Sequence, residues 1–212
     1  MVSHSHKFVF IHIPKTGGTS IAHALAPYGI VLRGSQNRSS LYFKHASAVD
    51  IERMLGEECA SYFKFSVVRN PWDWAVSNYL FNRGLHYPWT RGTSYNVCPD
   101  IPAWAGDWPF KRWLAWWLKE LQPQQSRMLT DRRGRLFVDH LMRFESINAD
   151  FSELLTMLKI GHTTLPHKML RPVHVDYSLY YDRETWEMVA AHFGEDIDRF
   201  DYKILKRPPL QG

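Results

Sequence analysis

The sequence predicts an α/β fold, in which a parallel β-sheet is flanked by helices. Two strand–loop–helix units predict it, one over residues 8–26 and one over residues 62–82. The strands at residues 8–13 and 62–68 are rich in β-branched and aromatic residues, which is typical of parallel strands buried on both faces. At 212 residues, the chain has the length of a single α/β domain.

The helices of the two units begin with recognisable signals. Gly18 or Thr19 is the expected N-cap of a helix at residues 19–26, and Asn70 of a helix from 71 to about 82 whose first residue is a proline. Hydrophobic spacing predicts the remaining elements, which are helices at residues 46–55, 110–121, 148–158 and 184–193 and a strand at residues 136–144. The stretch from beyond Arg83 to Trp108 is irregular and rich in Pro, Gly, Tyr and Trp, and long loops of this kind in compact domains are usually lids or binding loops.

Charge and hydropathy exclude several classes of protein. The chain has 26 Lys and Arg against 21 Asp and Glu, a net charge of +5 that favours an anionic ligand. The basic residues are scattered, which argues against nucleic-acid binding. No stretch approaches the ~18 consecutive apolar residues of a membrane span, and no signal peptide is evident, so we expect a cytoplasmic protein without stable membrane insertion. The spacing of Cys59 and Cys98 suggests no metal site, and both thiols are expected to be reduced.

Residues 15–20, KTGGTS, combine a lysine, three hydroxyl side chains and two glycines between a buried strand and a helix. The glycines let the backbone curl closely around a ligand, and the first turn of the helix presents unpaired N–H groups to an anion. Lys15 adds a full positive charge. An ordinary strand-to-helix turn needs only the glycines, so the pattern favours a cradle for a phosphate or sulfate group.

A second anion-binding pattern follows the strand at residues 62–68. Arg69 lies at its carboxyl end, where open α/β sheets bind their ligands, and a guanidinium can hold a phosphate with two hydrogen bonds. Ser77 can add a hydroxyl from the following helix. The alternative role for Arg69 is a surface ion pair, for example with Asp73. Two such strand ends indicate a ligand with two separated anionic groups.

The two motifs together resemble those of the sulfotransferases that use 3'-phosphoadenosine 5'-phosphosulfate (PAPS), especially the family that includes heparan sulfate 2-O-sulfotransferases and many bacterial members. IPKTGGTS is similar to the family's 5'-phosphosulfate loop, and VVRNPWDWAVSNY is similar to its 3'-phosphate motif. Further segments resemble the family in the same order, namely KHASAVDI, VDHLMRFESINADF and LPHKMLRPVHVDYSLYYD. One departure is Trp74, where a basic residue is common in the family.

The resemblance implies a P-loop-NTPase-like parallel sheet within a single sulfotransferase domain over residues 1–212. Its PAPS-binding core would comprise residues of about 7–84 and 135–160, with an acceptor-side loop at about 85–109 and a C-terminal helical segment at 176–205. PAPS would be a co-substrate that leaves as adenosine 3',5'-bisphosphate, without a metal. The acceptor would be a hydroxyl group of a glycan, lipid or small molecule, with a carbohydrate or small alcohol favoured.

The resemblance also implies roles for individual residues. Lys15 would contact the bridging oxygen of the phosphosulfate and stabilise the leaving phosphate. The 5' end would also be held by Thr16, Gly17, Gly18, Thr19 and Ser20. Arg69 and Ser77 would bind the 3'-phosphate. His45 would be the general base, since it aligns with the histidine that has this role in the glycan branch of the family.

Other histidines and the tryptophans have alternative roles. The alternative role for His45 is to cap a helix or to pack against other residues, although its role as a base is favoured, and His12 is expected to be structural. His167 and His174 are expected either to line an acceptor pocket or to lie on the surface. Helical spacing predicts a core face of Trp113, Trp116 and Trp117. The candidates for acceptor contact are Trp89, Trp104 and Trp108.

Two other functions are compatible with an anion-binding α/β fold. A P-loop-like kinase has the pattern GxxxxGK[ST], but Lys15 precedes the glycines instead of following them. Such a kinase also needs an acidic residue that holds Mg²⁺, and Asp139, which follows an apolar run, could resemble that residue. A non-catalytic anion-binding domain is the other alternative, and the joint presence of Lys15, Arg69 and Ser77 argues against it.

Overall fold

The computed structural model describes residues 1–29, 45–83, 107–121, 124–161, 163–166 and 176–203. The chain forms two compact units. The first, which we call the sheet unit, comprises Met1–Arg69 and Gln125–Met169. The second comprises Asn70–Gln124 and Leu170–Gly212, and we call it the helical unit because its described regular elements are helices.

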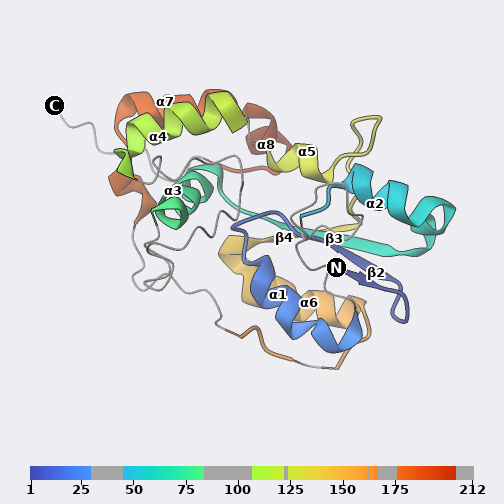
Figure 1. The fold of residues 1–212 in the computed structure, drawn as a ribbon. Coiled ribbons are helices and arrows are strands. Elements are labelled where there is room, and N and C mark those ends of the chain that lie inside the picture. Colours follow the sequence, from blue (N-terminus) through green and yellow to red (C-terminus); the bar gives the residue numbers. More distant parts are fainter. Residues whose placement is uncertain (30–44, 84–106, 122–123, 162, 167–175, 204–212) are drawn as a thin grey trace. The chain divides into compact units, whose positions relative to one another are not determined.

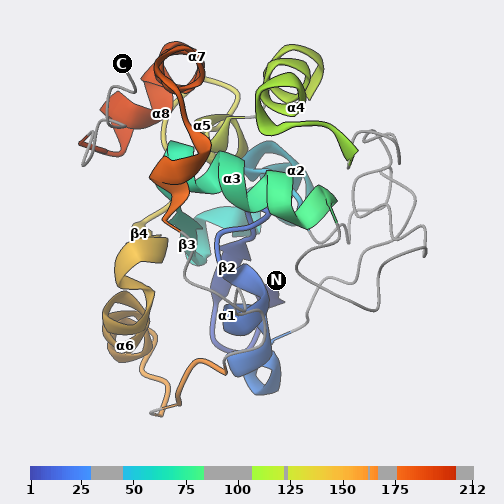
Figure 2. The same cartoon turned by 90° about the vertical axis from the view of Figure 1, so that its left-hand side faces the viewer.

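The sheet contains β1 (Val2–Ser3), β2 (Phe8–Ile11), β3 (Phe63–Val68) and β4 (His140–Arg143), in that spatial order. β2, β3 and β4 are parallel, and β1 pairs antiparallel with β2. Figure 2 shows the three parallel strands side by side, with α1 and α6 near them. The predicted parallel sheet is therefore confirmed. The predicted strand at residues 136–144 is shorter in the structure, because Leu136 forms an isolated bridge with Thr130 before β4 begins.

Helices cover both faces of the sheet (Figure 1). They are α1 (Gly18–Ala24), α2 (Ala48–Leu55), α5 (Gln125–Leu129) and α6 (Ile147–Met157), with 3-10 turns at Ala26–Tyr28, Gly56–Ser61 and Phe144–Ser146. α1 and α6 pack together on one face, and α2 and α5 contact each other on the opposite face. Ser47 caps α2 through a capping box with Asp50, which explains why the helix begins at Ala48.

The core beneath α1 and α6 is built from alternate strand residues, since successive side chains of a strand point to opposite faces. The strands contribute Phe8, Phe10, Phe65, Val67 and Met142, and the helices contribute Ile21, Leu25, Phe151, Leu154 and Leu155. The rings of Phe10 and Phe65 stack with centroids 5.2 Å apart. This apolar layer fixes the strand register that brings the ends of β2 and β3 together.

The helical unit contains α3 (Pro71–Asn82), α4 (Phe110–Trp116), α7 (Arg183–His192) and α8 (Gly194–Arg199), a π-helical turn at Trp117–Leu121 and a 3-10 turn at Tyr177–Tyr180. Asn70 caps α3, as predicted, because its side chain accepts from the N–H of Trp72 at 3.0 Å. Trp72 stacks on Trp186 with ring centroids 4.7 Å apart, and its indole N–H donates to the Trp186 carbonyl.

Of the predicted tryptophan core face, Trp113 and Trp117 are buried and stacked, whereas Trp116 is half-buried. Trp74 is buried as well, edge-on to Trp117. The departure from the family pattern at Trp74 therefore contributes to packing of the helical unit. Cys59 is buried and free. In the described part of the chain, none of the helices is both long and apolar enough to cross a membrane.

Replacing Phe65 with Ala should lower the free energy of unfolding by about 3–5 kcal/mol, because it removes a fully buried ring from the layer between sheet and helices. Urea denaturation measures the change. Met157→Ala on α6 is the matched control, since Met157 is 44% exposed and its loss should change stability by less than about 0.5 kcal/mol. Equal effects of the two changes would contradict the assigned core.

Candidate functional site

The loop between β2 and α1 lies at the carboxyl end of the parallel sheet. β2 pairs with β3 through Ile11 and Ser66, so the ends of the two strands lie side by side. Arg69 follows β3 directly, and residues 12–17 follow β2. The sheet unit thereby brings Arg69 next to the loop that contains Lys15.

Gly17 is the N-cap of α1, and its backbone lies in the left-handed region at φ 85°. The prediction of Gly18 or Thr19 as the cap is therefore wrong. The helix begins earlier because Gly17 O already accepts the first helical hydrogen bond, from Ser20 N at 3.0 Å. A Cβ on Gly17 would lie 2.7 Å from Ile147 Cδ1 and would displace that side chain, but it is the left-handed backbone conformation that requires glycine here.

Gly18 is required for a different reason. A Cβ built on Gly18 would lie 2.2 Å from Cδ2 of His12, so the His12 ring lies directly against this glycine. His12 is buried and stacks on Phe10 with ring centroids 5.5 Å apart. The loop and the first turn of α1 thus pack against the imidazole of His12.

The hydroxyl side chains of the loop differ in their surroundings. Thr16 is fully buried, and its Oγ1 donates to the Ile13 carbonyl at 2.9 Å, which stabilises the turn itself. Thr19 and Ser20 are half-buried in the first turn of α1. The N-terminus of this helix therefore lies among hydroxyl side chains next to Lys15, as the sequence predicts for an anion cradle.

Lys15 has φ 64°, a left-handed conformation that costs a non-glycine residue about 1–2 kcal/mol. Its carbonyl oxygen accepts a hydrogen bond from Nη1 of Arg69 at 2.9 Å. Arg69 is only 5% exposed, and its guanidinium lies 3.9 Å from the ring centroid of Phe144. The two basic residues predicted from separate motifs are therefore joined by a hydrogen bond.

Two residues that sequence reasoning missed hold Arg69. Gln125, on α5, is fully buried, with Oε1 accepting from Arg69 N at 2.9 Å and Nε2 donating to Arg69 O at 2.8 Å. The second is Phe144, beneath the guanidinium. No local pattern identifies Gln125, because its partner is 56 residues away in the chain. Phe144 lies within a segment that resembles the family, but the resemblance gave it no role.

His45 lies half-buried near the start of α2. Its Nδ1 is 2.8 Å from the backbone carbonyl of His12, and its ring lies edge-on to that of His12 with centroids 4.6 Å apart. Because a carbonyl can only accept, Nδ1 carries the proton, and Nε2 is then the acceptor nitrogen of the neutral ring. This tautomer has the form that a general base requires.

Ser77 lies on α3, in the helical unit, and is 2% exposed. The sheet unit brings together residues 15–20, His45 and Arg69, whereas Ser77 belongs to the other unit. The predicted acceptor residues Trp89, Trp104, His167 and His174 lie outside the described residues. Trp108 is half-buried, with the Arg112 guanidinium 4.0 Å above its ring.

Asp139, the residue that could imitate a Mg²⁺-binding acid, precedes β4 at the amino end of the sheet. It forms a 3.0 Å ion pair with Lys64, near the start of β3. Because a parallel strand rises about 3.3 Å per residue, the length of β4 separates Asp139 from the edge that holds Lys15. Asp139 therefore stabilises the register between β3 and β4, and it lies too far from the Lys15 loop to hold a metal ion there. Among the described residues, no cluster of three or more His, Cys, Asp or Glu could hold a metal ion.

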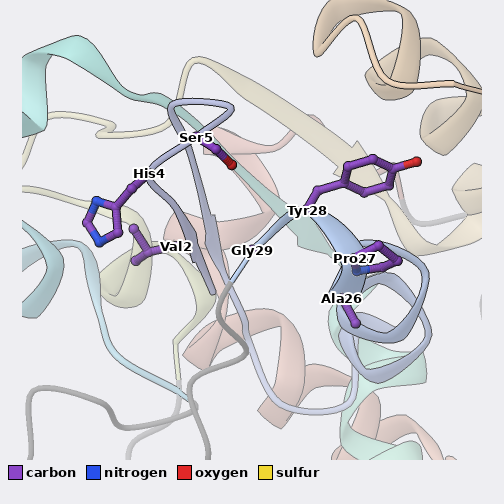
Figure 3. A pocket seen from close by; sticks show the side chains of 7 residues that line it. All are labelled: Val2, His4, Ser5, Ala26, Pro27, Tyr28 and Gly29. Carbon is purple, nitrogen blue, oxygen red and sulfur yellow. The ribbon is translucent and has the colours of Figure 1, made fainter.

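A surface pocket occurs at the opposite edge of the same unit. Figure 3 shows its lining side chains, which are Val2, His4, Ser5, Ala26, Pro27, Tyr28 and Gly29. These residues belong to β1, to the turn between β1 and β2 and to the segment after α1, and that turn lies at the amino end of β2. The pocket is thus separate from the Lys15 loop.

The parallel sheet and the loop at its carboxyl end have the arrangement of those α/β proteins that bind an anionic group between a strand and a helix. A model of the sulfotransferase family matches residues 1–203, across both units, and the chain therefore belongs to the sulfotransferase family. It is accordingly a transferase of sulfuryl groups. No curated protein matches the chain, and no solved structure does.

Gly18→Ala should destabilise the protein by about 1–3 kcal/mol, because the added methyl group displaces the His12 ring. In a His12→Ala background the same change should cost much less, since the space is then open. Urea denaturation of the four proteins of this double-mutant cycle measures the coupling. Additive effects would show that His12 is not the group that Gly18 must accommodate.

Proposed function

We propose that the protein transfers the sulfuryl group of PAPS to a hydroxyl acceptor at the carboxyl ends of β2 and β3. The observation that best supports this is the hydrogen bond between Arg69 Nη1 and Lys15 O. It joins the two segments that resemble the 5'-phosphosulfate and 3'-phosphate motifs of PAPS-dependent sulfotransferases. A donor with two separated anionic groups could bind one group at each of these two segments.

The reaction is a direct displacement. The acceptor oxygen forms a bond to sulfur while the bond from sulfur to the 5'-phosphate oxygen breaks, and the electron pair of that bond stays on the phosphate. The products are the sulfate ester and adenosine 3',5'-bisphosphate. As in phosphoryl transfer, the protein contributes mainly positioning and stabilisation of charge.

On the donor side, Lys15 would meet the charge that develops on the leaving oxygen. The rest of the 5' end would be bound by Thr16, Gly17, Gly18, Thr19 and Ser20, at the N-terminus of α1. Arg69 and Ser77 would bind the 3'-phosphate. A guanidinium has five N–H donors, so Arg69 can hold Lys15 O and an anion together.

On the acceptor side, His45 would take the proton of the attacking hydroxyl on Nε2. The His12 carbonyl supports this role because it keeps the proton on Nδ1 and orients the ring. We assign the hydroxyl to a carbohydrate or small alcohol; most of the acceptor-side loop expected at about 85–109 lies outside the described residues. The chemistry as proposed needs no metal, and the protein would act in the cytoplasm.

Adenosine 3',5'-bisphosphate should raise the melting temperature of the protein, and Mg²⁺ should add little, because the phosphates are held by Lys15, Arg69 and backbone N–H groups. At a product concentration 100 times its Kd, the stabilisation should be about 2.7 kcal/mol. Differential scanning fluorimetry makes the measurement, with ATP and Mg²⁺ as the comparison. Stabilisation by ATP with Mg²⁺ but not by the bisphosphate would favour a kinase instead.

Lys15→Ala should reduce kcat by about 100- to 1,000-fold, the usual effect of removing one group that stabilises developing charge. Transfer of labelled sulfate from PAPS to a panel of glycans, lipids, phenols and alkyl alcohols makes the measurement. Lys119→Ala, with a side chain 83% exposed in the helical unit, is the control and should leave turnover unchanged. Product binding without turnover on any acceptor would instead favour a non-catalytic anion-binding domain.

His45→Ala should lower kcat by about 100-fold or more while adenosine 3',5'-bisphosphate still binds, because a general base acts on the acceptor and not on the donor. Steady-state kinetics and product titration separate the two quantities. His23→Ala on the exposed side of α1 is the matched histidine control. If His45→Ala turned over as fast as the unaltered protein, His45 would have no part in proton transfer.

A further inference from the structure

We propose that Gln125 is a positioning residue for sulfuryl transfer, because it holds the main chain of Arg69 while the Arg69 guanidinium fixes the backbone of Lys15. The inference rests on the proposed function, since it concerns the same loop. It adds a residue that neither motif contains. Its basis is a continuous set of contacts from α5 to the Lys15 loop, all within the sheet unit.

The first contact is a pair of hydrogen bonds, which we call the amide clamp. Gln125 Oε1 accepts from Arg69 N at 2.9 Å, and Gln125 Nε2 donates to Arg69 O at 2.8 Å. The pairing of β3 with β4 ends at Val68 and Arg143, so Arg69 is the first residue beyond the ladder. The clamp gives Arg69 the two hydrogen bonds that a neighbouring strand would otherwise supply.

The clamp also ties together two distant points of the chain. The chain leaves the sheet unit after Arg69 and returns to it at Gln125. Because Gln125 is fully buried, water does not compete for these hydrogen bonds. The main chain of Arg69 is therefore fixed at the point where the polypeptide departs from the sheet.

The second set of contacts fixes the side chain of Arg69. Its guanidinium lies over the Phe144 ring at 3.9 Å and donates to Lys15 O at 2.9 Å. Lys15 is in a left-handed conformation at φ 64°, which persists only where the surroundings impose it. The Arg69 hydrogen bond is one such restraint, and it acts at the residue proposed to meet the leaving oxygen.

The primary amide of Gln125 satisfies both groups of the clamp, because it carries one acceptor and one donor group. An ionised Glu at position 125 accepts from Arg69 N but cannot donate to Arg69 O, and Leu can do neither. Each change should let the Arg69 backbone shift and loosen its hold on Lys15. Small displacements of catalytic groups have large effects on rate, so the consequence should appear in kcat as well as in stability.

The test compares Gln125→Leu and Gln125→Glu with Leu129→Ala. Leu129 is also fully buried on α5, so its truncation destabilises the same helix without altering the amide clamp. The measurements are kcat, KM for PAPS, Kd for adenosine 3',5'-bisphosphate and the melting temperature. All are taken where circular dichroism shows each variant folded.

We expect Gln125→Leu to lower kcat and weaken bisphosphate binding by about tenfold or more each, and Gln125→Glu to have a smaller effect in the same direction. Leu129→Ala should lower the melting temperature similarly but leave kcat and Kd within about twofold. Adding Gln125→Leu to Arg69→Met should cause little further loss, because both changes act through Arg69.

The outcomes separate the two proposals. If the unaltered protein did not bind adenosine 3',5'-bisphosphate, the PAPS-dependent function would fail. If it bound, and the folded Gln125 variants kept kcat and Kd within twofold, the positioning role would be overturned while the function stood. Equal losses in Leu129→Ala would also overturn it, since the effect would then be general destabilisation. Should Gln125→Leu not fold, Gln125→Glu decides by the same criteria.

Discussion

The hydrogen bond from Arg69 to the Lys15 carbonyl joins the ends of the two central parallel strands, and the geometry of the loop depends on it. Lys15 occupies a backbone conformation that a lysine adopts only at a cost. Arg69 can impose that conformation because its own backbone and guanidinium are both held, by Gln125 and Phe144. An arginine whose side chain contacted only solvent would be too mobile to hold the backbone of Lys15 in that conformation.

His12 serves two neighbours at once. Its ring occupies the space that any side chain at position 18 would need, and its carbonyl orients His45. The strand that positions the Lys15 loop thus also fixes the tautomer of the proposed base. In the proposed mechanism, donor and acceptor chemistry are therefore linked through the end of β2, and a shift of that strand would disturb both.

Much of the fold could be predicted because its signals are local. β2 is a continuous apolar run, β3 is rich in aromatic and β-branched residues, and α3 has both an Asn cap and an initial proline. β1 and α5 were not predicted, since elements of two and five residues are too short to show a period. The start of α1 was misplaced because left-handed Gly17 already accepts the first helical hydrogen bond.

The sequence by itself determined the chemistry at each strand end, namely a lysine before two glycines and an arginine after a buried strand. These features depend on neighbouring residues, so they are readable without the fold. Only the tertiary structure decided that Arg69 holds Lys15, that Gln125 holds Arg69, and that His45 bonds to His12. These partners are 54, 56 and 33 residues apart, and packing of the sheet and its helices brings them together.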